Sequence, residues 1–136
     1  MSLIPAVAAA SVLAFGGSLG WTSISPGHLM TDGKLSGLGE AHDQRSFFFT
    51  GKVTPDGCKE YTTQGRLSVN GGSLTFTARP AGRCGAPAHP DAYYRFTIVA
   101  GTGTLEGASG GGTILADHGQ DIWKGRLVTP KPLSSR

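Results

Sequence analysis

The dipeptide Asn70–Gly71 lies between two segments of alternating hydrophobicity, and it constrains the fold more than any other feature of the sequence. A two-residue hairpin turn of type I′ needs positive φ at both central positions, and Asn-Gly adopts that conformation readily. With these residues as the turn, Leu67 pairs with Leu74. Two residues further from the turn, Gly65 pairs with Phe76. The sequence therefore predicts a β-hairpin of defined register over residues 61–78.

Two cysteines flank this hairpin on its open side. The same register, continued outward, places Cys58 opposite Arg83 and one residue from Cys84, close enough for a disulfide after a small adjustment. An exported chain with two cysteines normally pairs them, whereas a cytosolic chain would keep two buried thiols. We therefore expect a Cys58–Cys84 disulfide, with two free thiols as the alternative.

Several other short segments are predicted strands separated by glycine-containing turns; the first of them alternates only weakly, and the others contain aromatic or β-branched residues. They are residues 33–41, 46–53, 93–100, 113–116 and 122–128. No amphipathic helix follows the N-terminal apolar segment, and the connections are short hairpins. The predicted fold is all-β: a small antiparallel up-and-down barrel of about eight strands. It forms one domain over residues 21–128, with a flexible tail at 129–136.

An uncharged apolar run from Leu3 to Phe15 precedes the predicted barrel, and the first charged residue is Asp32. The length of the run suits the hydrophobic region of a secretory signal and is short for a bilayer span. Residues 1–20 are therefore predicted to be a secretory leader, the protein to be secreted, and no transmembrane span to follow the leader. The leader lacks the basic residues that normally begin a signal. The alternatives are an upstream start, a retained anchor, or a buried N-terminal helix or strand.

One strand and the glycine-rich segment after it, Tyr94 to Gly110, resemble the allene oxide cyclase and dirigent-like β-barrels. In these families a strand runs into Gly-Gly-Thr/Ser-Gly, then an apolar residue, then Gly-Ala-x-Gly. Here Ala100 replaces the first glycine and Leu105 holds the apolar position. Similar stretches occur in uncharacterised exported bacterial proteins, followed by a Trp-x-Gly-x-Leu like residues 123–127. The resemblance implies an eight-stranded barrel with an apolar cavity, but none of the family's catalytic residues can be placed on this sequence.

Six aromatic side chains are candidates to line such a cavity and bind a small apolar ligand. They are Phe47, Phe49, Phe76, Tyr94, Phe96 and Trp123. In a chain of this length, the alternative is that the same rings fill the barrel.

The sequence carries no convergent catalytic set. Residues 107–111, Gly-Ala-Ser-Gly-Gly, match the nucleophile-elbow pattern, but no helix follows them. The four histidines lie in turn-like segments without the spacing of metal ligands, so neither a metal site nor a cofactor is predicted. Glu40 and His42, two residues apart on a possible strand, form the best acid–base pair.

The formal net charge is +3, and the Lys and Arg residues are scattered singly along the chain, so no nucleic-acid partner is predicted. These features favour an exported or cell-surface barrel that is non-catalytic and binds a small apolar ligand or a partner. One alternative is a cofactor-independent cyclase or isomerase acting on an apolar substrate inside the barrel. Another is a structural or adhesive surface protein that assembles through an exposed edge strand. The sequence decides neither whether the chain is an enzyme nor its oligomeric state.

Overall fold

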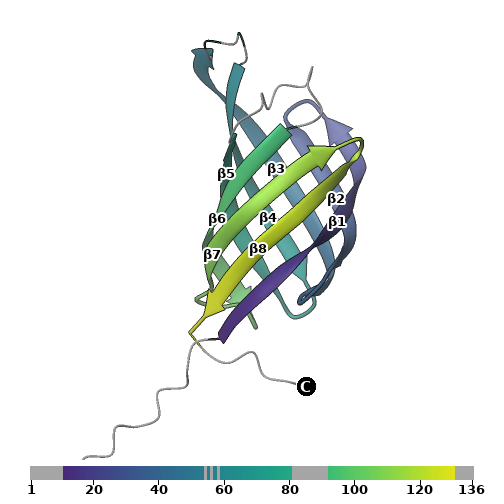
Figure 1. Cartoon of the computed structure of the whole chain (residues 1–136), viewed down its shortest axis with the longest axis vertical. Coiled ribbons are helices and arrows are strands. Elements are labelled where there is room, and N and C mark those ends of the chain that lie inside the picture. The colour runs from purple at the N-terminus through teal and green to yellow at the C-terminus, as the bar shows by residue number, and fades with distance from the viewer. Residues whose placement is uncertain (1–10, 54, 56, 58, 81–91, 131–136) are drawn as a thin grey trace, which may run out of the picture.

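Eight antiparallel strands, adjacent in chain order, form a closed barrel in the computed structural model (Figure 1). The structure describes residues 11–53, 55, 57, 59–80 and 92–130. The strands are β1 (Ser11–Ser25), β2 (His28–Leu35), β3 (Gly39–Val53), β4 (Lys59–Val69), β5 (Gly72–Pro80), β6 (Ala92–Gly103), β7 (Ser109–Asp117) and β8 (Gln120–Thr129). Each strand pairs with the next, and β1 pairs with β8 to close the ring. The predicted fold class, an up-and-down barrel of about eight strands, is confirmed.

The hairpin at Asn70–Gly71 has the predicted register. Leu67 pairs with Leu74, and Gly65 pairs with Phe76. Gly71 has a φ of 87°, in the left-handed region that the turn requires. The two cysteines predicted to bridge the open end of this hairpin, Cys58 and Cys84, lie outside the described residues.

The barrel begins within the segment that the sequence assigned to a leader. Residues 11–20 pair along their whole length with β8, from Ser11 opposite Thr129 to Gly20 opposite Gln120. Among them, Phe15 and Leu19 are buried in the barrel core. The domain boundaries therefore shift from 21–128 to 11–129, and Thr129, assigned to the tail, is the last residue of β8.

The physical reason for this shift lies in the outward positions of β1. Leu13, Phe15 and Leu19 alternate as expected for a strand with one buried face, but the intervening positions hold Ala14 and Gly16 rather than charged residues. The alternation is therefore hidden, and a half-buried strand has the composition of a signal segment. Of the alternatives considered, a buried N-terminal strand describes residues 11–20. No helix long and apolar enough to cross a membrane occurs in the described part of the chain.

The two ends of the barrel differ, and they are named here by their positions in Figure 1. The lower end carries the β2–β3, β4–β5 and β6–β7 connections together with the start of β1 and the end of β8. There the β6–β7 loop folds inward, so that Leu105 and Ala108 are buried in the core. Gly101 permits this loop, because a Cβ at that position would lie 2.0 Å from the carbonyl oxygen of Leu105. The upper end carries the β1–β2 and β7–β8 turns and a hairpin extension of β3 and β4 that projects beyond the rim (Figure 1).

Aromatic rings fill the middle of the barrel. The ring centroid of Trp123 lies 5.2 Å from that of Phe76 and 5.1 Å from that of Phe96. Gly125 makes room for this cluster, because a Cβ there would lie 2.7 Å from ring carbons of both Phe15 and Phe96. The lower half and the centre of the barrel are thus a packed hydrophobic core.

Candidate functional site

The upper half of the barrel interior holds two carboxylates and one guanidinium. Asp43 and Asp121 are 0% exposed and Arg45 is 3% exposed. Arg45 Nε donates to Asp43 Oδ2 over 2.6 Å, and Arg45 Nη2 forms an ion pair with Asp121 Oδ2. Arg45 therefore connects β3 to β8 through the interior. We call Asp43, Arg45 and Asp121 the ionic cluster.

Strand parity places these charges inside the barrel. Successive residues of a strand face opposite sides of a sheet, so Asp43 and Arg45 share the inward face of β3 with buried Ala41. Asp121 lies two residues before the buried Trp123 on β8 and therefore shares its face. Gly65, opposite Arg45 on β4, leaves room for the arginine side chain, because a Cβ there would lie 2.7 Å from Arg45 Cγ.

Neighbouring side chains hold the ionic cluster in place. Thr31 Oγ1 donates to Asp43 Oδ2 over 3.3 Å. The half-buried Trp21 donates its indole N–H to Asp121 Oδ1 over 2.9 Å. The Arg45 guanidinium carbon lies 5.8 Å from the centroid of the Trp123 ring, within the range of a cation–π contact. Each charged group therefore has at least two neighbours that favour its position.

Three buried polar atoms in this half of the barrel have no hydrogen-bond partner among the described residues. They are Asp43 Oδ1, Thr63 Oγ1 and the indole nitrogen of Trp123. A buried polar group without a partner costs about 1–3 kcal/mol of stability, so native proteins contain few of them. The site therefore retains one acceptor, one donor and one hydroxyl that can serve as either.

Burial also shifts the ionisation of two groups beside Arg45. Desolvation raises the pKa of Asp43, although the charge of Arg45 and the hydrogen bonds from Arg45 and Thr31 partly oppose the shift. Burial likewise raises the pKa of Tyr94, and the charge of Arg45 partly opposes it. The two carboxylates and one guanidinium sum to a formal charge of −1, so a proton on Asp43 would make the ionic cluster neutral.

The six aromatic residues predicted to line a ligand site are separated by the structure. Phe76, Tyr94, Phe96 and Trp123 are buried inside the barrel. Phe47 is half-buried in the middle of β3 and packs against the core. Phe49 is 48% exposed on the projecting hairpin, where its ring centroid lies 5.7 Å from that of Tyr61. Four of the six residues therefore occupy one interior, and Phe49 belongs to the outer surface.

The packed centre of the barrel bears on the alternatives drawn from the sequence. A cyclase that encloses a whole apolar substrate needs a hollow chamber, but Phe76, Phe96 and Trp123 contact one another across the centre. An adhesive protein that adds strands at an edge needs a free edge. In the barrel wall each described strand is paired on both sides, but among the described residues β3 has no β2 partner beyond Ser46 and β4 has no β5 partner before Thr63, so the projecting hairpin keeps two free edges. The cyclase alternative would therefore require the barrel to rearrange, whereas the adhesive alternative would not.

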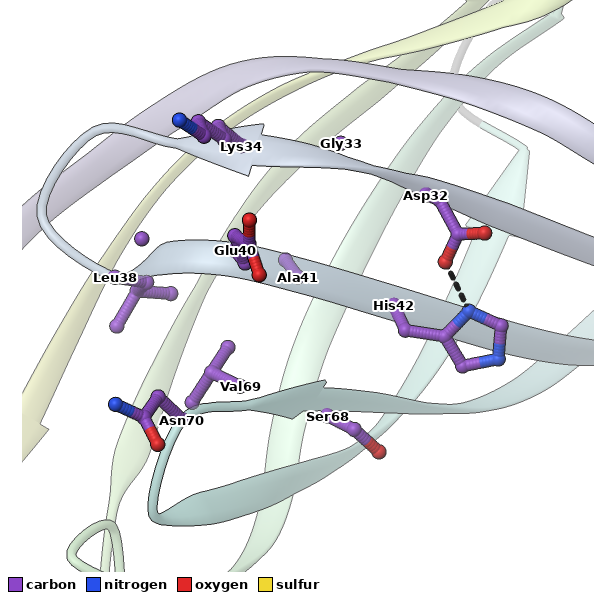
Figure 2. A pocket seen from close by; sticks show the side chains of 11 residues that line it. Asp32, Gly33, Lys34, Leu38, Glu40, Ala41, His42, Ser68, Val69 and Asn70 are labelled. Carbon is purple, nitrogen blue, oxygen red and sulfur yellow. Dashed lines mark hydrogen bonds and ion pairs between the residues drawn. The ribbon is translucent and has the colours of Figure 1, made fainter.

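A second candidate site is a groove of about 960 Å³ on the outer face of β2, β3 and β4, shown in Figure 2. His42 Nδ1 contacts Asp32 Oδ1 there, and His42 Nε2 lies 3.3 Å from the side-chain nitrogen of Gln44. Asp32, on the neighbouring strand, is thus the acid partner of His42, and the expected partner Glu40 lies further along the groove. With the Asp32 and His42 side chains 55% and 33% exposed, the pair remains in contact with water. The groove therefore lacks the dry, preorganised surroundings of a catalytic pair.

Two further sequence patterns show no catalytic arrangement in the structure. Ser109, the central residue of the elbow-like segment, is the first residue of β7, so a strand follows it instead of a helix. Among the described residues, no group of three or more His, Cys, Asp or Glu side chains is placed to hold a metal ion.

Comparisons of the chain with protein-family models, with curated proteins and with solved structures found no match. The resemblance to the allene oxide cyclase-like barrels therefore stays a prediction, and the functional proposal depends on the site itself. No pattern in the sequence predicted the ionic cluster. The structure extends the strand predicted over residues 46–53 back to Gly39, and only with that extension does parity with Phe47 place Asp43 and Arg45 on the inward face.

Proposed function

We propose that the protein is a non-catalytic binding barrel that takes a small molecule at the upper end of its interior, where side chains around the ionic cluster move apart to admit it. The observation that carries this proposal is the set of unpartnered buried polar atoms beside the ionic cluster. Ligand sites in barrels commonly lie at one end, where a few polar groups converge on apolar and aromatic walls. Here Asp43, Thr63 and Trp123 supply the polar atoms, and Tyr94 and Phe96 belong to the aromatic wall.

A purely structural role explains the ionic cluster less well. Buried ion pairs contribute little net stability compared with apolar residues of the same volume, and unpartnered polar atoms reduce stability further. The lower half of the same barrel shows that this chain can fill its interior with leucine and aromatic side chains. Charges retained in the upper half therefore support a role in recognition.

The chemistry of these atoms indicates the class of ligand. Asp43 Oδ1 requires a donor, whereas the indole N–H of Trp123 requires an acceptor. The formal charge of −1 on the ionic cluster disfavours an anionic head group. We therefore propose a mainly apolar molecule whose head group is an amine or an amide, with the head near Asp43 and the body against the rings.

Three matched probes test this proposal on the full chain: phenethylamine, phenylacetamide and phenylacetate. Thermal shift and native mass spectrometry should detect binding of the amine and the amide, and little or no binding of the acid. The variant Asp43→Asn should lose most of the affinity for the amine, whereas Lys34→Gln on the outer face should change nothing. Preferential binding of phenylacetate, or equal binding of the amine to the Asp43→Asn variant, would contradict the proposed head-group recognition.

Export remains part of the proposal. Removal of residues 11–20 would remove the pairing between β1 and β8, so we propose that any leader is cleaved before Ser11. N-terminal sequencing of protein recovered outside the cell tests this, and a mature chain that begins after Phe15 would contradict it. The proposed Cys58–Cys84 disulfide can be measured on the same material by its mass before and after reduction.

A further inference from the structure

Four cationic side chains gather on the outer face of the wall formed by β5, β6, β7 and β8. They are Arg79, Arg95, Lys124 and Arg126, all of them exposed, and we call them the basic face. Arg79 pairs with Arg95 across β5 and β6, and the same row continues through Thr113 on β7 to Lys124 on β8. Arg126 lies two residues along β8 from Lys124, on the same side of the sheet. The four strands are consecutive neighbours in the barrel wall (Figure 1).

The charges of the basic face are not neutralised within the described part of the chain. None of the four cations forms an ion pair with another described residue. The described carboxylates of this half of the chain lie elsewhere: Glu106 is in the β6–β7 loop, Asp117 contacts His118 beside the β7–β8 turn, and Asp121 is buried.

The pairing of Arg79 with Arg95 is unfavourable in the isolated protein. Like charges directly opposite each other on neighbouring strands destabilise a sheet. Here two guanidinium groups occupy such a pair, with a third cation in the same row. An anionic partner that bridges the row would remove this repulsion, so charge complementarity identifies the partner as a polyanion.

The rest of the surface distinguishes among polyanions. Between the cations lie the hydroxyls of Thr77, Thr97 and Thr113. The row itself has no aromatic side chain, and the single aromatic residue beside it, Tyr93, is half-buried, so successive bases of a single strand have no stacking platform. The wall also offers no helix or ribbon to enter a duplex groove. The next row of the same face holds Tyr93, Leu115 and Ile122, of which the first two are half-buried and Ile122 is 39% exposed. These side chains do not form the continuous, fully exposed apolar face that enters a bilayer surface. Hydroxyls alternating with cations suit a sugar polymer, whose own hydroxyls both donate and accept hydrogen bonds.

We infer that the basic face binds a linear acidic polysaccharide, one that carries carboxylate or sulfate groups. Neighbouring strands lie about 4.8 Å apart, so the row from Arg79 to Lys124 is roughly 14 Å long and contacts several successive anionic groups of an extended chain. This surface is separate from the ligand site inside the barrel, and it binds whether or not that site is occupied.

The experiment measures binding of a fluorescently labelled heparin octasaccharide to the full chain by anisotropy, at low and at physiological salt. The double variant Arg79→Gln/Arg95→Gln should bind roughly tenfold more weakly than the unmodified chain, and the affinity of the unmodified chain should fall as salt is raised. The matched control, Lys34→Gln/Lys52→Gln, removes the same net charge from β2 and β3, and its affinity should change by less than about twofold.

The folding of the double variant is checked independently. Because it removes a like-charge pair, its midpoint of urea denaturation should equal or exceed that of the unmodified chain. The variant Arg95→Lys, which keeps the charge, should retain most of the binding.

Equal loss of binding in the double variant and in the control would overturn the inference, since net charge alone would then account for it. Tighter binding of a short single-stranded DNA, or of phosphatidylserine vesicles, than of the octasaccharide would overturn the choice of partner.

Discussion

The two halves of the barrel interior are filled by different chemistry, although the same strands form both. In the lower half, Leu35, Leu74, Leu105 and Leu127 pack below the aromatic cluster and are almost completely buried. In the upper half, the ionic cluster and two threonines, Thr31 and Thr63, occupy equally buried positions. The lower half removes apolar surface from water, which is the main favourable contribution to folding. The upper half removes charged groups from water, which costs free energy, and their attraction to one another offsets that cost.

This difference indicates how the chain divides stability from recognition. The lower half and the β6–β7 loop supply a core whose rings and leucines fix the strands. The upper half can then hold the ionic cluster, although apolar residues of the same volume in its place would make the protein equally stable or more stable.

Removal of Arg45 should have the largest effect on stability. Arg45→Met leaves Asp43 and Asp121 buried without their counter-ion, so the free energy of unfolding should fall by about 3–5 kcal/mol. Urea denaturation measures the loss. The informative control is the triple variant Asp43→Leu/Arg45→Met/Asp121→Leu, which should recover most of that stability because no charge remains buried. A triple variant as unstable as Arg45→Met would show that the upper half depends on its charges for folding.

Truncation of a leucine in the lower half should also lower the free energy of unfolding, through the loss of apolar packing and not through an unpaired charge. Leu127→Ala removes a fully buried side chain and leaves a cavity, so the free energy of unfolding should fall by about 2–5 kcal/mol. The exposed Val12, on the neighbouring strand β1, provides the control, and Val12→Ala should change stability by less than about 0.5 kcal/mol. Equal losses from the two substitutions would mean that the lower half is not the stabilising core.

The pH dependence of stability should single out Asp43. Because burial raises its pKa above the ordinary value of 3.8, the folded chain keeps a proton that the unfolded chain has already released. The stability that Asp43 contributes is therefore complete below the pKa of the unfolded state and is lost as pH rises toward the folded pKa. The variant Asp43→Asn cannot lose a proton, so its stability relative to the unmodified chain should increase with pH, by at most about 1.4 kcal/mol per pH unit.

This prediction is checked by urea denaturation of both proteins from pH 4 upward, since groups common to the two cancel in the difference. A difference that stays constant with pH, or that falls as pH rises, would contradict the raised pKa.

The pair of Asp32 and His42 on the outer face should contribute least to the free energy of unfolding. Asp32→Asn weakens a contact whose partners are both partly exposed to water, so the loss should be about 0.2–1 kcal/mol, well below that of Arg45→Met. The loss should also shrink at high salt, unlike that of the buried ionic cluster. A loss above about 2 kcal/mol, measured in the same denaturation assay, would remove the contrast between outer and inner ion pairs.

Local patterns in the sequence were sufficient to predict the architecture. Asn70–Gly71 predicted both a turn and the register on either side of it, because turn type and side-chain alternation act over a few residues. Alternation failed in β1, where glycine and alanine occupy outward positions and hide the period. Alternation also did not predict that Asp43 and Arg45 face the interior, since charged residues are expected to face water.

The candidate sites depend on contacts that no local pattern contains. Arg45 meets Asp121 only because β3 and β8 face each other across a closed ring, and Arg79 meets Arg95 only through the register of β5 with β6. Asp32 and His42 are cross-strand partners through the β2–β3 hairpin, a weak segment in the sequence. In each case the sequence shows the charged residue, whereas the pairing of strands decides its partner.

The pairing of β1 with β8 also sets the order of events during synthesis. Ser11 pairs with Thr129, so β1, the first described strand to be synthesised, cannot pair with β8 until that last strand has been made. Until then the growing chain exposes the backbone hydrogen-bonding groups of β1, together with those of whichever strand was made most recently. Contacts between such distant residues form slowly, because the chain must first close a long loop. A fragment that ends before Gln120 should therefore aggregate instead of folding, because the barrel closes only when its final ten-residue strand is complete.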